Sequence, residues 1–119
     1  MKTVLFVDDE EMNLFILNRL FSNDFNVITA SSAADGIEVI KEQVDEIDVV
    51  VTDLKMPEVS GLQMISEVEG LLKDKPKFLL TGYNYHAEID EAVANNKITG
   101  VFKKPFDFEE IRQVLKEQF

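Results

Sequence analysis

The sequence predicts an α/β fold, a doubly wound (βα)5 three-layer sandwich with a five-stranded parallel sheet between two layers of helices. Three observations predict it. Apolar runs that suit buried strands alternate five times with segments of helical periodicity. The connections are short, so right-handed strand–helix–strand crossovers are expected. No internal repeat or linker interrupts the 119 residues, so we expect one domain over residues 1–119.

Five runs have the composition of strands. Thr3–Val7 is a continuous apolar run, as expected for a strand covered on both faces, and Ile47–Asp53 is predicted to be the second buried strand. Phe25–Ala30 is half polar and suits an edge of the sheet. Lys77–Leu80 is expected to be a third central strand, and Val101–Lys103 is expected to be a last, short strand.

The helices are expected over residues 10–21, 32–44, 60–72, 86–96 and 107–119. Ser60 and Gln63 have the spacing of a capping box, and Asp107 precedes two glutamates as a cap of the last helix. The apolar stripe of the first helix is predicted to consist largely of Met12, Phe15, Ile16, Leu20 and Phe21.

Composition excludes several functions. The net charge is −11 and no basic patch offsets it, so neither nucleic acid nor a membrane surface is an expected partner. There is no cysteine for a disulfide or a thiolate metal site, and no apolar run approaches the ~20 residues of a membrane span. We therefore expect a cytoplasmic protein. Met1 directly abuts the first strand, so no N-terminal extension is expected, whereas a C-terminal output domain stays open.

Polar residues follow the strands at the point where each one ends. Asp8 and Asp9 come after the first strand, Asp53 ends the third, Thr81 follows the fourth and Lys104 follows the fifth. Sites in parallel sheets lie at the carboxyl ends of the strands, near the place where strand order reverses. Three carboxylates, a hydroxyl and an ammonium are therefore expected to converge on one edge.

Such a group of acids needs a cation. Two carboxylates about 4 Å apart repel by about 4 kcal/mol at an effective dielectric constant near 20. Oxygen ligands without a nearby histidine or cysteine favour a hard ion, Mg²⁺ before Mn²⁺. The alternative is that Asp8 or Asp9 only caps the following helix, and one of them is expected to do so in addition.

Four motifs together resemble a known family. Asp53 with Met56-Pro57 and Gly61 is similar to the phosphoacceptor loop of response regulator receiver domains. The start at residues 7–10, the Thr81-Gly82 pair and the Lys-Lys-Pro-Phe run at 103–106 resemble the family's other signatures. The resemblance covers the chain from end to end. It implies a flavodoxin-like fold with strand order 2-1-3-4-5.

The resemblance also implies roles for the acids. Asp53 would be the nucleophile that takes a phosphoryl group from a sensor histidine kinase or a histidine phosphotransfer protein. Asp9 would ligate Mg²⁺ directly and Asp8 largely through water. Asp53 itself and the backbone carbonyl of Lys55 would complete the protein ligands. Phosphoryl transfer needs such a cation to neutralise charge on the moving group.

Two further residues belong to the implied switch. Lys104 would pair with Asp53 at rest and with the phosphoryl oxygens afterwards, and the Thr81 hydroxyl would hydrogen-bond the phosphoryl group. Such a protein is a signalling switch that catalyses only its own phosphorylation and slow dephosphorylation. Its predicted partner surface is the fourth and fifth helices with the strand between them, directed at an output protein or domain, and a phosphorylation-dependent dimer stays open.

The chain departs from the family at one position. The usual aromatic relay, three residues before the lysine, is Val101. Its neighbour Phe102 is expected to point to the opposite face of the sheet and so not to replace it. Tyr83 is a candidate to shield the phosphoryl group instead.

Two other functions fit a similar scaffold. A phosphohydrolase with an aspartyl nucleophile needs a second acid two residues later, where this chain has Lys55. A flavin or nucleotide binder needs a loop rich in glycine or hydroxyl groups after the first strand. The acidic residues 8–11 stand there instead and would repel phosphate.

Overall fold

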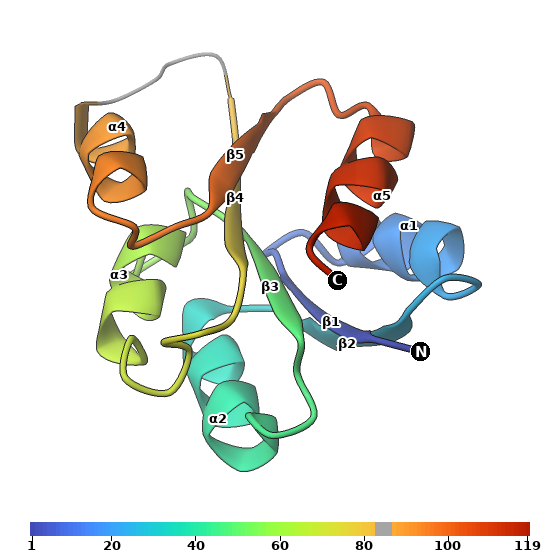
Figure 1. The fold of residues 1–119 in the computed structure, drawn as a ribbon, viewed down its shortest axis with the longest axis horizontal. Coiled ribbons are helices and arrows are strands. Elements are labelled where there is room, and N and C mark those ends of the chain that lie inside the picture. Colours follow the sequence, from blue (N-terminus) through green and yellow to red (C-terminus); the bar gives the residue numbers. More distant parts are fainter. Residues whose placement is uncertain (83–86) are drawn as a thin grey trace.

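Five parallel strands form the centre of the molecule in a computed structural model that describes residues 1–82 and 87–119 (Figure 1). Their order across the sheet is β2-β1-β3-β4-β5, which confirms the predicted order. The strands are β1 (Thr3–Val7), β2 (Asn26–Ala30), β3 (Val49–Asp53), β4 (Lys77–Thr81) and β5 (Gly100–Lys103). As predicted, β2 is an edge strand, and its residues are less buried than those of β1 and β3.

Helices cover both faces of the sheet, so the predicted three-layer fold is confirmed. In Figure 1, α1 and α5 lie on one side of the sheet and α2, α3 and α4 on the other. Their bounds are α1 (Glu11–Phe21), α2 (Ala33–Gln43), α3 (Gly61–Glu67), α4 (Ala87–Ala94) and α5 (Phe108–Glu117). Among the described residues, no helix combines the length and the apolar character needed to cross a membrane.

Alternation along the strands divides the core into two clusters. Val4 and Phe6 of β1 pack with Leu17 of α1 and Ile111 of α5 on one face of the sheet. Their neighbours Leu5 and Val7 belong to the cluster on the face of α2, α3 and α4. Successive side chains of a strand point to opposite faces, so an apolar run without alternation supplies both clusters at once.

The predicted inward stripe of α1 is wrong in four of its five positions. The helix buries Leu14, Leu17 and Phe21, which are spaced three and four residues apart. The other predicted members are exposed to different degrees: Met12 69%, Phe15 58%, Ile16 38% and Leu20 36%. Two apolar stripes of helical spacing run along this helix, and the sheet takes the one that contains the two buried leucines.

The third helix is shorter than predicted. Its capping box is confirmed, because the Ser60 side chain accepts from the Gln63 N–H and the Gln63 side chain accepts from the Ser60 N–H. The helix ends at Glu67 rather than near residue 72, and turns that include Gly70 lead to β4. Glycine loses more conformational freedom in a helix than other residues. The predicted start of the fourth helix, at residue 86, lies outside the described residues.

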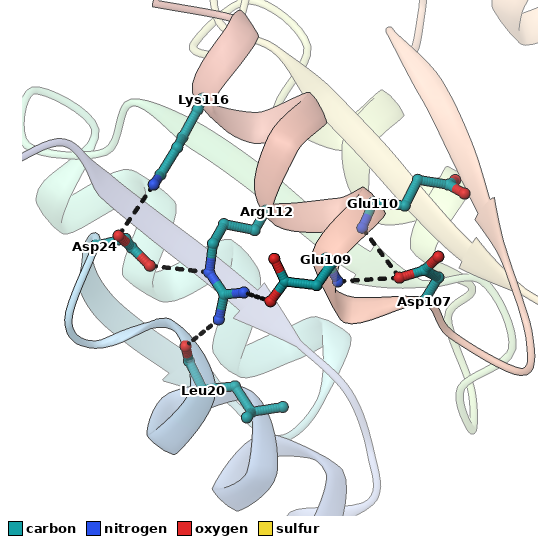
Figure 2. A network of polar contacts seen from close by, with 7 residues as sticks. All are labelled: Leu20, Asp24, Asp107, Glu109, Glu110, Arg112 and Lys116. Atoms are coloured by element: carbon teal, nitrogen blue, oxygen red, sulfur yellow. Dashed lines mark hydrogen bonds and ion pairs between the residues drawn. The ribbon is translucent and has the colours of Figure 1, made fainter.

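A polar network ties α5 to the connection between α1 and β2 (Figure 2). The Arg112 guanidinium donates from Nε to Asp24 Oδ2 at 2.9 Å and from Nη2 to the carbonyl oxygen of Leu20 at 2.7 Å. Lys116 Nζ lies 3.1 Å from the other Asp24 oxygen, and Glu109 accepts from Arg112 Nη1. One guanidinium thus joins α5 to the end of α1 and to the turn that follows it.

Candidate functional site

Asp53 ends β3 at the carboxyl edge of the sheet. The three valines before it are fully buried, and Asp53 itself is only 5% exposed. Its neighbours across the sheet are set by register, since Val7 pairs with Thr52 and Asp53 pairs with Leu80. The strand therefore carries a carboxylate into a position where few water molecules reach it.

Asp8 and Asp9 meet Asp53 at this edge, as the sequence predicts. Each of the three offers a carboxylate oxygen, and these oxygens all lie within 4.8 Å of one another. Asp8 is fully buried, whereas Asp9 is exposed. One acid of the cluster thus faces solvent while two are held in the protein.

Asp8 also organises the start of α1, which is the second role that the sequence leaves open. Its Oδ1 accepts from the Glu10 N–H at 2.9 Å, and its Oδ2 accepts from the Asn13 side-chain amide at 3.2 Å. Glu10 is the N-cap residue and makes no side-chain cap bond, but its own backbone N–H is satisfied by Asp8. Asn13 is a site residue that the sequence analysis misses. Its only sequence signal is an amide in the first turn after the acids.

Lys104 brings positive charge to the same carboxylate. Its Nζ lies 3.7 Å from Asp53 Oδ2. The backbone N–H of Lys104 donates to the Thr81 carbonyl oxygen at 2.8 Å, which extends the pairing of β4 with β5 beyond Lys103. The sheet ladder therefore determines how far the lysine reaches over the site.

Burial raises the pKa of Asp53 from its ordinary value of 3.8 to about 6. Desolvation is the largest cause, and the charges of Asp8 and Asp9 act in the same direction. The Lys104 charge and a hydrogen bond from the Lys55 backbone oppose it. One lysine does not balance the cluster, so the site has a deficit of positive charge.

Thr81 stands at the same edge, at the end of β4. It is buried, and its strand partner in β5 is Lys103. The fourth and fifth strands thus deliver a hydroxyl-bearing residue and a lysine to the edge that carries the acids. Gly82, which follows Thr81, is exposed.

The loop after Asp53 is packed tightly against the site. The Gly61 N–H donates to the Leu54 carbonyl oxygen at 2.8 Å, which folds the loop back onto the start of α3. A Cβ at Gly61 would lie 2.2 Å from the Asp53 carbonyl oxygen. No side chain fits in that space, so the glycine of the motif is required by close approach to the backbone of Asp53.

The positions that depart from the receiver pattern behave as predicted where the structure describes them. Val101 packs on the cluster beside α2, α3 and α4, whereas Phe102 lies in the other cluster and stacks on Phe78 at 5.0 Å between ring centroids. Phe102 therefore does not take the place of the aromatic relay. Tyr83 lies outside the described residues. Lys55 is exposed over the loop, and the role of its carbonyl stays a prediction.

The donor set fits a hard divalent cation. The cluster contains carboxylate oxygens, which suit Mg²⁺ or Mn²⁺. The pKa of Asp53 is raised first by burial of its charge and then by the charges of Asp8 and Asp9, and a bound cation would oppose both effects. Both observations come from these residues and agree with the predicted cation.

Known proteins resemble the chain over nearly all of its length. The response regulator receiver domain family matches residues 4–116. Transcriptional regulatory protein GlrR of Escherichia coli (strain K12) is 34% identical over 118 residues, covering 96% of this chain and 25% of GlrR. Sensor kinase CckA of Brucella abortus (strain 2308) is 30% identical over 116 residues, covering 97% of this chain and 12% of CckA.

A solved structure agrees with these relatives. A response regulator receiver domain protein from Clostridium thermocellum superposes with a TM-score of 0.87 at 28% identity, covering 98% of this chain and 93% of that chain. The chain spans a quarter or less of the length of the two curated relatives named above. Neither the family match nor these relatives favour the phosphohydrolase. The match over residues 4–116, together with an aspartate cluster and a lysine at the carboxyl edge of the sheet, shows that the chain belongs to the response regulator receiver domains of two-component systems.

Proposed function

We propose that Asp53 accepts a phosphoryl group from a phosphohistidine of a sensor histidine kinase or a histidine phosphotransfer protein. One observation carries the proposal. A nearly buried carboxylate lies in a cluster with two other acids and 3.7 Å from the Lys104 ammonium. A simple structural aspartate would not need two like charges beside it. We place this exchange in the cytoplasm, where ATP supplies the phosphoryl groups of histidine kinases.

The transfer is a displacement at phosphorus. An oxygen of Asp53 forms a bond to phosphorus while the bond from phosphorus to the histidine nitrogen breaks, and that nitrogen keeps the electron pair. Lys104 moves its charge from the Asp53 carboxylate to the phosphoryl oxygens. The Thr81 hydroxyl donates a hydrogen bond to the same group. Positioning and charge neutralisation do most of the work in phosphoryl transfer.

The cation would be held by the acids at the edge. Asp9 and Asp53 would ligate Mg²⁺ directly, with the Lys55 carbonyl, and Asp8 would act through water. The hydrogen bonds that Asp8 already accepts from Glu10 and Asn13 support this indirect role, because each of its oxygens already uses part of its acceptor capacity within the protein. When bound, Mg²⁺ supplies charge neutralisation at the phosphoryl oxygens.

The proposed activity is that of a switch. The acyl phosphate on Asp53 is labile and returns to the carboxylate by attack of water at phosphorus. The protein has no separate substrate to turn over. Phosphorylation would be read at α4, β5 and α5, because Thr81 ends the strand that leads to α4 and Lys104 begins the connection from β5 to α5. Equal binding of a partner to the phosphorylated and the unmodified protein would contradict the proposed role of this surface. Dimerisation of the phosphorylated protein through this surface is the alternative to a separate partner.

A mass measurement tests the central claim. Incubation with acetyl phosphate and Mg²⁺ is expected to give a protein carrying one added phosphate. The adduct should disappear in Asp53→Ala and persist in Asp45→Asn, a matched change at an exposed aspartate. An adduct retained in Asp53→Ala would overturn the assignment, and sustained hydrolysis of a phosphomonoester would favour the phosphohydrolase.

A further inference from the structure

Lys104 lies between two groups that attract it. Its Nζ is 3.7 Å from Asp53 Oδ2 and 5.6 Å from the centre of the Phe106 ring. The first distance is longer than a good hydrogen bond between an ammonium and a carboxylate, so the carboxylate alone does not fix the ammonium. The second lies within the ~6 Å over which an aromatic ring attracts a cation. The lysine side chain is 35% exposed, so it is free to move unless something holds it.

Phe106 is well placed to hold it, because the ring is anchored. It packs against the core cluster of α1 and α5, and its centre is 6.3 Å from that of Phe108 at a tilt of 60°. Phe108 is the first residue of α5, whose N-cap Asp107 accepts hydrogen bonds from Glu109 and Glu110. The ring is therefore attached to the helix start, whereas the lysine is a flexible chain of four methylenes.

We propose that Phe106 is a positioning residue for Lys104, and that its ring holds the ammonium beside Asp53, ready for the incoming phosphoryl oxygens. The inference rests on the proposed role of Lys104 in phosphoryl transfer. Without the ring, the side chain must lose its rotational freedom during the reaction itself. Cation–ring attraction at a partly exposed site corresponds to about a two- to five-fold effect on rate.

The kinetic test measures the rate at which three variants are phosphorylated by acetyl phosphate in the presence of Mg²⁺. Phe106→Leu removes the ring and keeps apolar volume, and it should be about two- to five-fold slower than the wild type. Phe106→Tyr keeps the ring and should restore the rate. Phe25→Leu is the control, since it removes a ring of the same core cluster that is paired with Phe21 rather than with Phe106. Equal slowing by Phe106→Leu and Phe25→Leu would overturn the proposal, because the effect would then be general packing.

A double-mutant cycle shows whether the ring acts through the lysine. In a Lys104→Met background, Phe106→Leu should cause no further slowing. Additive effects of the two substitutions would contradict the inference. A wild-type rate for Lys104→Met would show instead that the proposed role of Lys104 is wrong, and the positioning role would fail with it.

An NMR measurement on the unphosphorylated protein tests the contact independently of any chemistry. The protons next to the Lys104 ammonium should be shifted upfield by the ring current of Phe106. The shift should persist in Phe106→Tyr and vanish in Phe106→Leu. If the upfield shift is present but the protein is not phosphorylated, the contact is correct and the proposed function is wrong. The absence of an upfield shift in the wild type would overturn the inference.

Discussion

Folding places Asp53 in an environment that disfavours the ionised form of its carboxyl group. A carboxyl group whose pKa rises from 3.8 to about 6 is protonated more readily in the folded than in the unfolded chain. By linkage, the folded state then loses stability as the pH rises through this window. The shift corresponds to about 3 kcal/mol above pH ~6, where Asp53 is ionised in both states. The metal-free fold thus bears a cost at the residue that is proposed to accept the phosphoryl group.

Asp53→Asn is therefore expected to stabilise the metal-free protein by up to about 3 kcal/mol at pH ~7.5. The gain should shrink toward zero near pH ~4, because wild-type Asp53 is then protonated in the folded state and carries no charge to relieve. Urea unfolding in the presence of a chelator, followed at several pH values, measures the difference.

The control for this experiment is Asp45→Asn, which removes the same charge from an exposed site. Its effect on the free energy of unfolding should be small and nearly independent of pH between about 4 and 7.5. A pH-independent gain in Asp53→Asn, or an equal gain in Asp45→Asn, would show that burial of Asp53 is not the cause.

One element that borders the site is α1, which begins two residues after Asp9. Its outward face carries apolar side chains that the sheet leaves uncovered, including Phe15 at 58% and Met12 at 69% exposed. A donor protein must bring its phosphohistidine to Asp53, so it must cover the surface around this edge. If Asp53 takes its phosphoryl group from a protein donor, as proposed above, the outer face of α1 is expected to contact that donor.

Phe15→Ser should slow phosphoryl transfer from a phosphohistidine-bearing donor protein by about ten-fold, because exposed aromatic side chains are frequent anchors of interfaces. The rate with acetyl phosphate should stay unchanged, since that small donor needs no docking surface. Leu71→Ser is the control, because Leu71 is 44% exposed and lies with Lys2 and Pro76 near the amino ends of the strands. Equal loss in both variants would rule out docking on α1.

The elements show what a sequence can and cannot predict here. The strands and the helix caps at Ser60 and Asp107 follow from local pattern, whereas the strand order is implied by the resemblance to receiver domains; all of these are confirmed. The stripe of α1 is mistaken because periodicity identifies two apolar faces, and only packing against β1 decides between them. Size misleads in this helix: Leu14 and Leu17 are buried while the larger Phe15 is exposed.

The residues of the site also fall into a group that the sequence predicts and a group that it does not. The acids, Thr81 and Lys104 are predictable because each follows a strand, and parallel strands end at one edge. Asn13 and Phe106 are not predictable in this way. Each acts through a neighbour whose side chain is placed by folding: Asn13 donates to Asp8, and the Phe106 ring lies near Lys104. Contacts of this kind depend on side-chain rotamers, which local sequence does not specify.

At the scale of the whole molecule, charge acts in two separable ways. A net charge of −11 repels itself over the entire surface, and any salt screens that repulsion. The three acids at the edge of the sheet add a local repulsion that only a bound cation relieves efficiently. Mg²⁺ is therefore expected to stabilise the fold both generally, as salt, and specifically, as a ligand.

Specific binding should raise the free energy of unfolding by about 1.4 kcal/mol at a Mg²⁺ concentration about ten-fold above its Kd. Asp9→Asn should lose this gain. It is the informative substitution because Asp9 is exposed, whereas Asp8 is buried and accepts two hydrogen bonds that its replacement would break. Thermal unfolding in MgCl₂ and in NaCl of equal ionic strength separates binding from screening.

Asp45→Asn completes the design, since it changes the net charge by the same amount as Asp9→Asn but lies outside the cluster. Both variants should respond to NaCl alike, because general repulsion is reduced equally in the two. Only the Asp45→Asn protein should keep the additional stabilisation by Mg²⁺. If Asp9→Asn kept it as well, or if NaCl reproduced it in the wild type, the acids at the edge of the sheet would not form a magnesium site.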